Sequence, residues 1–387
     1  MYERVATVGL DVHYRFSQVT MRDAAARVVC RERLEHEDRQ ALRDRLQQWP
    51  QGVVAVMEAS FGWGWLSDEM VAAGLEVELS NCYKLEQMRK ARGMAKTNAK
   101  DASLLSLLPF ERTDWWKVWR SPPEVRDQRE WMRYRAGLVA MGTATQLRIR
   151  AIFHRYGIFP DVRRLYGGKG RRFLAALCRD GRAGGLQLPA GALANLRGQV
   201  RLLEHLRGQQ AEVERKLHGQ LQRSPLTRRL DRVPGFGLIL SHTVVAEIGR
   251  IERFRDHRHL ASYSLLAPIC QDSGEAEPGK APLGRHLGVH GNLTLKWTFI
   301  EAARGAVRKG GRWRKMFDAY TAGGQRHRNR GYIKVARGLI KVIYAMWRDG
   351  TAYSEVPPAR PGRQRDRPQG RTRSGTGQLS QPMVAGR

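Results

Sequence analysis

The 387-residue chain has only four cysteines, and no two of them form a CxxC pair. Cys30, Cys82, Cys178 and Cys270 lie far apart, which argues against a zinc site or a disulfide framework and fits a reducing compartment. No apolar run reaches the length of a membrane span, and the opening stretch MYERVATVGLDVH has no apolar signal-peptide core. We therefore expect a soluble intracellular protein that has no membrane partner.

Acidic residues are also scarce. The chain has 37 Asp and Glu against 68 Lys and Arg, which gives a net charge of +31. Such an excess of positive charge favours a polyanionic partner, because each neutralised phosphate releases counterions. The charge is spread along the chain, so it indicates nucleic acid without locating a groove, and a merely basic soluble protein is the alternative. The 42% hydrophobic content is typical of folded domains rather than disorder.

The first part of the chain has the pattern of an α/β domain. Three strand-like segments come first, and helix-like and strand-like segments then alternate. This order predicts a mixed sheet flanked by helices. The expected strands are 4–13, 16–24, 27–34, 52–60 and 75–81, and the expected helices are 36–49 and 63–74.

The remainder is predicted to be mostly helical. We expect domains at 1–123 (α/β), 124–225 (helical, coiled-coil-like) and 226–350 (mostly α-helical). A disordered basic tail is expected at 351–387, because residues 356–387 hold seven arginines and few apolar side chains. In the middle region an apolar seam recurs at helical spacing, and it predicts either a helix packed on its own domain or a contact between copies. The seam comprises Leu196, Val200, Leu203, Val213, Leu217 and Leu221.

Three isolated acids follow apolar segments of the first domain. Asp11 ends the first strand in GLDVH, Glu58 ends a later strand in VMEAS, and Asp101 begins a helix in KTNAKDA, one turn after Asn98. Carboxylates that converge on a sheet edge repel one another and persist where a divalent cation neutralises them. Oxygen ligands of this kind suit Mg²⁺. The alternative is that each acid is a solvated loop or cap residue.

Two segments of the C-terminal domain suggest contacts with DNA. Ser273 lies in the loop CQDSGEAEPGK and is a candidate nucleophile, although a Ser-Gly pair in a polar loop is usually a turn. VPGFG, with Gly235 and Gly237, resembles the hairpin of helix-hairpin-helix modules, whose backbone amides contact phosphates, and a simple turn is equally compatible. Candidate cations and polar groups near the loop are Lys280, Arg285, His286, His290 and Asn292. The cluster DWWKVWR is expected to be core rather than a base-stacking surface.

Taken together, these segments resemble the DEDD-type transposases of bacterial insertion sequences, the insertion sequence 110 family. The resemblance covers about residues 4–350. It rests on GLDVH, VMEAS and KTNAKDA, on LDRVPGFGLILSHTVVAEIGRIERFRDHRHLASYSLLAP, and on the following SG, GN and LTLKWTFIEAARGAV. Two segments depart from the family pattern. Asn98 stands where the family usually has Asp, and GRHLGVHGN lacks the usual stretch before Gly291 and Asn292.

The resemblance implies an RNase H-like (RuvC-like) first domain that holds Mg²⁺ at Asp11, Glu58 and Asp101, with a weaker contribution from Asn98. It further implies that Ser273 forms a covalent phosphoserine with DNA. Members of the family are similar in using a structured noncoding bridge RNA and in acting as homo-oligomers, dimers or tetramers. A bacterial, cytoplasmic, nucleoid-associated location would follow.

The sequence therefore predicts an RNA-guided DNA transposase or recombinase with a magnesium-dependent acidic site and a serine nucleophile. The first alternative is a Holliday-junction-type nuclease that uses the acidic site alone, with water as the nucleophile. The second is a catalytically impaired copy that only binds nucleic acid, an alternative that Asn98 keeps open.

Overall fold

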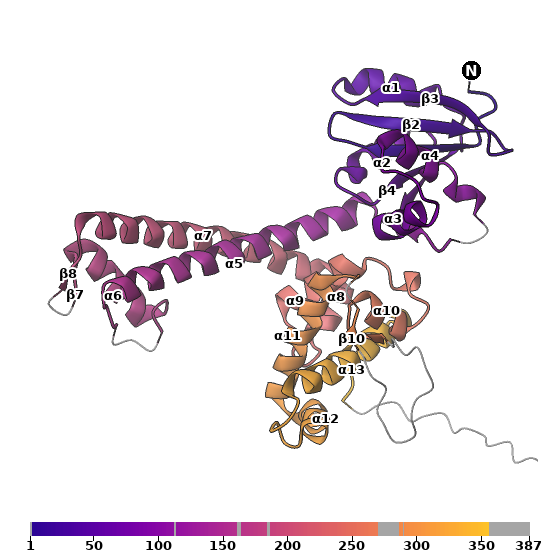
Figure 1. Cartoon of the computed structure of the whole chain (residues 1–387). Helices are drawn as coiled ribbons and strands as arrows, with labels where there is room; N and C mark the ends of the chain where they lie inside the picture. The colour runs from indigo at the N-terminus through magenta and orange to yellow at the C-terminus, as the bar shows by residue number, and fades with distance from the viewer. Residues whose placement is uncertain are drawn as a thin grey trace, which may run out of the picture. The chain divides into compact units, whose positions relative to one another are not determined.

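The computed structural model describes residues 2–111, 114–160, 164–183, 186–269, 286–288 and 290–355 (Figure 1). By its internal contacts the chain divides into Met1–Tyr353 and Ser354–Arg387. The described helices and strands all belong to the first of these units.

The first domain is built on a six-stranded mixed sheet with the strand order β3-β2-β1-β4-β5-β6. β1, β2 and β3 form an antiparallel meander, β4 and β5 continue the sheet parallel to β1, and β6 is antiparallel to β5. The strands are β1 (Thr7–Val12), β2 (Phe16–Arg22), β3 (Val28–Glu35), β4 (Val54–Glu58), β5 (Glu76–Ser80) and β6 (Lys117–Val118). The predicted mixed sheet is confirmed, and the short β6 is an addition that the sequence did not predict.

Helices cover both faces of this sheet because the strands bury side chains on both sides. In β4, Ala55 and Met57 pack in a core with α1 and α2, whereas Val56 packs in a second core with α3 and α4. Trp116 is buried in that second core, so this member of the tryptophan cluster is core as predicted. The helices are α1 (Arg39–Gln47), α2 (Trp63–Ala72), α3 (Cys82–Ala91), α4 (Asn98–Leu105) and the 3-10 turn η1 (Leu108–Phe110).

α4 lies directly against β1 at Gly9. A Cβ at this position would stand 2.2 Å from the carbonyl oxygen of Ala102 and 2.3 Å from the amide nitrogen of Ser106. Hydrogen bonds from β1 and β2 hold the end of α4 on the sheet, since Thr7 Oγ1 donates to the Ser106 carbonyl at 2.8 Å and Arg22 Nε donates to Ser106 Oγ at 2.8 Å. Because glycine has no side chain at position 9, α4 can approach the sheet this closely.

Two long helices of the middle region, α5 (Pro123–Arg155) and α7 (Ala190–Arg223), run side by side (Figure 1). Leu196, Leu203, Val213 and Leu217 of the predicted seam are each at most 3% exposed within this chain. The seam is therefore explained by packing inside the chain, which was one of the two predicted alternatives. Between the helices lie α6 (Gly168–Asp180), β7 (Arg182–Ala183) and β8 (Leu186–Gln187).

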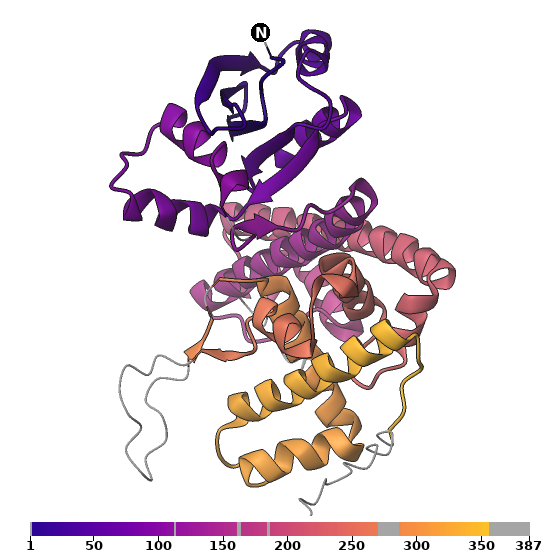
Figure 2. The ribbon, with the colours of Figure 1, turned by 90° about the vertical axis from the view of Figure 1, so that its right-hand side faces the viewer.

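The C-terminal domain is helical, as predicted, and its core joins α9, α11 and α13 through Val244, Phe299 and Leu339 (Figure 2). α8 and α9 flank the VPGFG segment. The elements are α8 (Pro225–Asp231), α9 (Leu238–Ile248), η2 (Ile251–Arg253), α10 (His257–Tyr263), β9 (Pro268–Ile269), β10 (His286–Leu287), α11 (Leu293–Lys309), α12 (Gly311–Thr321) and α13 (Arg328–Asp349).

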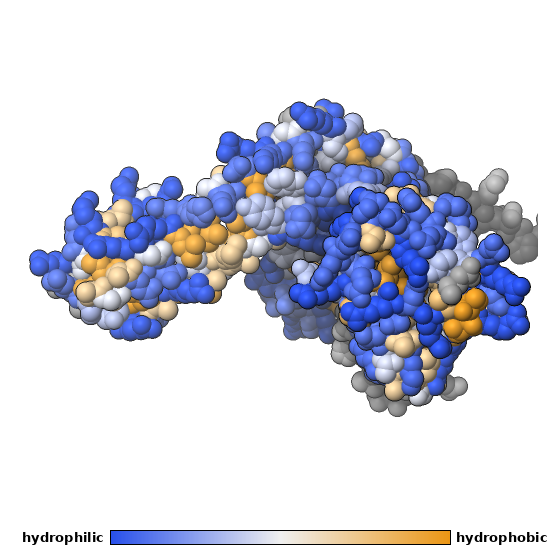
Figure 3. All heavy atoms as spheres, turned by 90° about the horizontal axis from the view of Figure 1, so that it is seen from above, coloured by the Kyte–Doolittle hydropathy of each residue, from blue (hydrophilic) through white to orange (hydrophobic). Residues whose placement is uncertain are grey.

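The face of the molecule in Figure 3 is mostly hydrophilic, with apolar patches along the α5–α7 pair. Exposed apolar side chains on these helices include Val139, Met141, Leu147 and Leu202. Across the described ranges, no helix combines the length and the apolar character that crossing a bilayer requires.

The contact at Gly9 gives a first prediction. We expect Gly9→Ala to destabilise the protein by about 1–3 kcal/mol, the usual cost of overpacking a closely packed contact, because α4 must move away from β1. Thermal or denaturant unfolding measures this change.

Gly137→Ala is the matched control, since a Cβ at that position of α5 meets no atom within 4 Å and alanine favours helix. Equal stability of the Gly9→Ala variant and the unmodified chain would show that α4 does not depend on this contact.

Candidate active site

Two of the predicted acids lie next to each other at the ends of parallel strands. The last paired residues of β1 and β4 are Leu10 and Met57, and Asp11 and Glu58 are the next residue of each strand. Because side chains alternate along a strand, Asp11 lies on the same face as Gly9, and Glu58 on the same face as Val56. Both therefore point to the face covered by α3 and α4.

Asp101, the third acid, lies on α4 at the same edge of the sheet as Asp11 and Glu58. Ala102 contacts Gly9, and Asp101 precedes Ala102 in the first turn of the helix, toward the end of β1 that carries Asp11. The side chain of Asp101 is only 14% exposed and lies 4.0 Å from Nε of Arg89. The close contact between α4 and β1 thus determines where the third carboxylate lies.

The three carboxylates repel one another. Burial raises the pKa of Glu58, and the negative charges of Asp11 and Asp101 raise it further. Burial and the charge of Asp11 likewise raise the pKa of Asp101. The pKa of Asp11 is raised by burial, against the opposing effect of His13, whose Nε2 lies 3.1 Å from the Asp11 carboxylate. The structure therefore gathers negative charge that is only partly compensated at one edge of the sheet.

Several neighbours of the acids were not assigned to the site from the sequence. The charge of Lys96 acts on all three carboxylates and lowers their pKa values. Desolvation and the charge of Glu58 raise the pKa of the Cys82 thiol to about 11. Cys82 begins α3, a helix that the sequence pattern did not predict, so the position of Cys82 beside Glu58 could not be seen. Lys96 lies in the KTNAKDA segment itself. Its positive charge close to Asp101 in the sequence was the feature that could have identified it as a neighbour of the acids.

The acid cluster has the chemistry of a hard-cation site, because it offers carboxylate oxygens whose mutual repulsion a divalent ion would relieve. Within the described ranges, however, no three His, Cys, Asp or Glu side chains converge closely enough to hold one ion in common. Asn98 is the first residue of α4 and is exposed, and no hydrogen bond among the described residues joins it to the three acids. The structure brings Asp11, Glu58 and Asp101 to one edge of the sheet, and Asn98 lies exposed one helical turn before Asp101.

The candidate residues of the C-terminal domain have separate environments. A Cβ at Gly235 would stand 2.0 Å from the Ala302 carbonyl oxygen of α11, whereas Gly237 caps α9 with open space around it. Asn292 caps α11, and its Nδ2 donates to Glu247 Oε2 at 2.7 Å. His286 lies in β10, and His290 lies in the bend before α11.

Gly235 and Asn292 thus have packing and capping roles in this structure. Ser273, Lys280 and Arg285 lie outside the described residues.

Two family models match this chain. The model for DEDD transposases of the IS110 type, described as Transposase, matches residues 8–158, which include all three acids. The model described as Transposase IS116/IS110/IS902 family matches residues 227–318. The chain belongs to the IS110 family of transposases.

Two curated proteins of insertion elements are similar to part of the chain. An uncharacterised 43.6 kDa protein of insertion element IS110 from Streptomyces coelicolor is 32% identical over 152 residues, 39% of this chain and 36% of that protein. An uncharacterised 44.8 kDa protein of insertion element IS116 from Streptomyces clavuligerus is 29% identical over 129 residues, 33% of this chain and 31% of that protein. The chain thus matches about a third of the length of each relative.

The raised carboxylate pKa values predict how stability depends on pH. A carboxyl group with a raised pKa binds its proton more tightly in the folded state than in the unfolded state. Stability of the metal-free protein therefore falls as the pH rises above the ordinary values of 3.8 for Asp and 4.5 for Glu, until the folded-state groups are ionised. At neutral pH we expect Glu58→Gln to raise the free energy of unfolding, by about 1 kcal/mol, the usual size of a single-substitution effect.

Thermal unfolding of the metal-free protein across this pH range measures the effect. Glu76→Gln is the control, since Glu76 is exposed at the start of the neighbouring β5. Mg²⁺ should raise the melting temperature of the unmodified chain more than that of Glu58→Gln. A melting temperature that Glu58→Gln lowers at neutral pH, or an equal response of both proteins to Mg²⁺, would contradict this account.

Proposed function

We propose that the chain is a DNA transposase that cuts and rejoins DNA at the ends of an insertion element and at its target. The observation that carries the proposal is the group of mutually repelling carboxylates Asp11, Glu58 and Asp101 at one edge of the sheet, in a chain of net charge +31. Membership in the IS110 transposase family supports it. Cytoplasmic action on chromosomal DNA belongs to the same proposal.

The acids would hold Mg²⁺, with Asp11, Glu58 and Asp101 as ligands and Asn98 as a weaker neutral one. Bound Mg²⁺ would supply positive charge to oppose the charge that develops on a reacting phosphate. The protein itself orients the carboxylates: β1 and β4 fix Asp11 and Glu58, and the contact at Gly9 fixes Asp101. Arg89, 4.0 Å from Asp101, restrains that side chain from the α3 side.

Ser273 would be the covalent nucleophile. Its Oγ would lose a proton and form a bond to the phosphorus of a DNA phosphodiester, while the bond from phosphorus to the leaving strand oxygen breaks and that oxygen takes up a proton. The product is a phosphoserine ester. Because one P–O ester bond replaces another, a hydroxyl of a second DNA end can reverse the step and join the strands without ATP.

The partners in this proposal are donor and target DNA, a structured noncoding guide RNA and further copies of the chain. The net charge of +31 supports binding to polyanions, and the family resemblance is the support for RNA guidance and for a dimer or tetramer. DNA beside the gene that encodes a foldable RNA with loops complementary to the element ends would strengthen the RNA part. Absence of such a segment would remove its support.

Covalent trapping tests the proposal. We expect the purified chain with Mg²⁺, the guide RNA and end-containing DNA to form a denaturation-resistant protein–DNA adduct, because the phosphoserine bond is covalent. Ser273→Ala should abolish the adduct, and Asp101→Asn should lower its rate about 10²- to 10³-fold, the size of losing one electrostatic contributor to a transition state.

Ser262→Ala and Asp44→Asn are the matched controls, since both residues are exposed on helices and neither lines a cavity that contains the acids. DNA nicking that survives Ser273→Ala would favour the nuclease that uses water. Neither nicks nor adducts from the folded protein would favour the copy that only binds nucleic acid.

A substitution at Asn98 tests the fourth ligand. We expect Asn98→Asp to leave adduct formation intact or to lower the Mg²⁺ concentration for half-maximal rate several-fold, because a carboxylate adds the negative charge that the amide lacks. Aspartate at a helix N-terminus also stabilises the folded protein by about 0.3–1 kcal/mol without metal. The readout is therefore the Mg²⁺ dependence of adduct formation rather than the stability alone.

Asn195→Asp, at an exposed position of α7, is the control for added charge. Loss of activity in a folded Asn98→Asp protein would show that Asn98 is not in a ligand position.

A further inference from the structure

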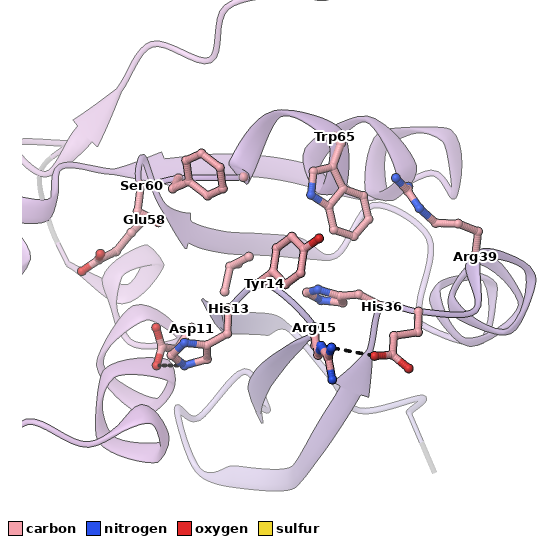
Figure 4. Close-up of a pocket in the computed structure, with 13 residues that line it drawn as sticks. Asp11, His13, Tyr14, Arg15, His36, Arg39, Glu58, Ser60 and Trp65 are labelled. Atoms are coloured by element: carbon pink, nitrogen blue, oxygen red, sulfur yellow. Dashed lines mark hydrogen bonds and ion pairs between the residues drawn. The ribbon is translucent and has the colours of Figure 1, made fainter. Parts of the chain in front are cut away.

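A cavity of about 830 Å³ opens beside the acids, and its lining includes Asp11 and Glu58. In Figure 4 these two carboxylates lie toward one end, Tyr14 lies near the middle, and Trp65 and Arg39 lie toward the other end. The volume is within the range of about 300–1,000 Å³ that small-molecule sites occupy. The cavity can therefore take a group larger than a phosphate next to the acidic site.

Two aromatic rings in the lining of this cavity have no packing partner. Tyr14 is 85% exposed and Phe61 is 90% exposed. Among the described residues, neither ring stacks on another ring or lies under a cation. Trp65 differs, because its ring meets the His36 ring nearly at right angles with the ring centroids 5.1 Å apart, and the Arg39 guanidinium covers the Trp65 face at 3.9 Å from the centroid. Tyr14 and Phe61 thus offer open aromatic faces at the mouth of a cavity.

A buried histidine also lines the cavity. His36 is 6% exposed, and its Nε2 lies 2.9 Å from Ser17 Oγ. This contact with β2 holds the ring in place, so His36 forms a fixed part of the cavity wall. A ligand with a flat apolar face would stack on the two open rings, Tyr14 and Phe61.

We propose that this cavity receives an unpaired nucleobase of the DNA strand whose phosphate lies at Asp11 and Glu58, stacked on Tyr14 and Phe61. The inference rests on the proposed function for the identity of the strand. Nucleobases are flat with polar edges, and stacking on aromatic side chains tolerates any base because each has a π face. The net charge of +31 favours a polyanion such as a DNA strand over a ligand that is not a polyanion.

The base must be unpaired, because in a duplex both of its faces are covered by neighbouring base pairs. Extruding a paired base costs a few kcal/mol, and the cost is least where the strand is already single. The cavity would therefore hold the strand at a position where the duplex has opened, and so fix which phosphate lies at the acids.

The test uses a single-stranded DNA oligonucleotide that carries one 2-aminopurine, whose fluorescence is quenched by stacking. The full-length chain is titrated in Ca²⁺ in place of Mg²⁺, so that binding is measured apart from cleavage. We expect quenching with the unmodified chain. Phe61→Ala and Tyr14→Ala should each weaken binding about tenfold to hundredfold, the effect of removing a stacking ring, and should relieve the quenching.

Phe159→Ala is the matched control, since Phe159 is also 90% exposed but follows α5 rather than lining the cavity. It should leave both affinity and quenching unchanged, and Phe61→Trp should retain them. Equal effects of Phe61→Ala and Phe159→Ala would overturn the proposal. So would equal quenching of a fully paired duplex, or quenching of an RNA oligonucleotide but not of the DNA.

Binding and chemistry are separable in this design. Ser273→Ala should lose the covalent adduct and keep the Phe61-dependent quenching. Quenching by a protein that forms no adduct under any condition would support the base site and contradict the proposed function. An adduct that forms at full rate in Phe61→Ala and Tyr14→Ala, without any Phe61-dependent quenching, would overturn the base site alone.

Discussion

The contact between α4 and β1 at Gly9 is the constraint on which the acidic site depends. The helix approaches the strand so closely that its backbone fills the space of a side chain at residue 9. Hydrogen bonds from Thr7 and Arg22 to Ser106 fix the helix at this height on the sheet. Because Asp101 lies little more than one turn from Ser106, the position of its carboxylate beside Asp11 follows from backbone packing rather than from any bond between the two acids.

Electrostatics at this edge oppose the stability of the fold. Burial raises the pKa of all three carboxyl groups, and the charge of Asp11 raises the pKa of Glu58 and Asp101 further, although the chain as a whole is strongly positive. Lys96 and Arg89 offset only part of this repulsion. A chain with 68 basic residues could have neutralised three carboxylates by pairing them, as Arg39 and Arg43 pair with Glu69. Carboxylates that remain unpaired and repel one another at one edge of a sheet are typical of a site that binds a cation or a substrate.

Local patterns in the sequence were sufficient for much of the fold and for the acids. Apolar segments predicted the strands that carry Asp11 and Glu58, a helix was expected at Asp101 as α4, and helical spacing predicted α7. α3 was missed because its sequence, CYKLEQMRKA, shows a weak apolar stripe, and with it Cys82 was missed as a neighbour of Glu58. The seam on α7 left two partners possible, since periodicity shows that a face is buried but not which surface buries it.

The cavity beside the acids shows why aromatic residues in loops are difficult to interpret from sequence alone. Tyr14 follows β1 and Phe61 follows β4, each three residues after an acid, in DVHY and EASF. In the sequence these rings are indistinguishable from rings that fold back into a core, as Trp116 does. Parallel pairing of β1 and β4 brings the two loops to the same end of the sheet, so that both rings line one cavity with both acids.

Glu58 also lines a second, smaller hollow of about 290 Å³, together with Asp101, Arg89 and Lys96. The first cavity thus combines the open rings of Tyr14 and Phe61 with two arginines, and the second hollow combines Arg89 and Lys96 with the ring of Tyr83. A polynucleotide strand presents flat bases and anionic phosphates in alternation along its length. A site that offers aromatic rings and cations together beside its acids matches that alternation, whereas a site for a free phosphate would need the cations alone.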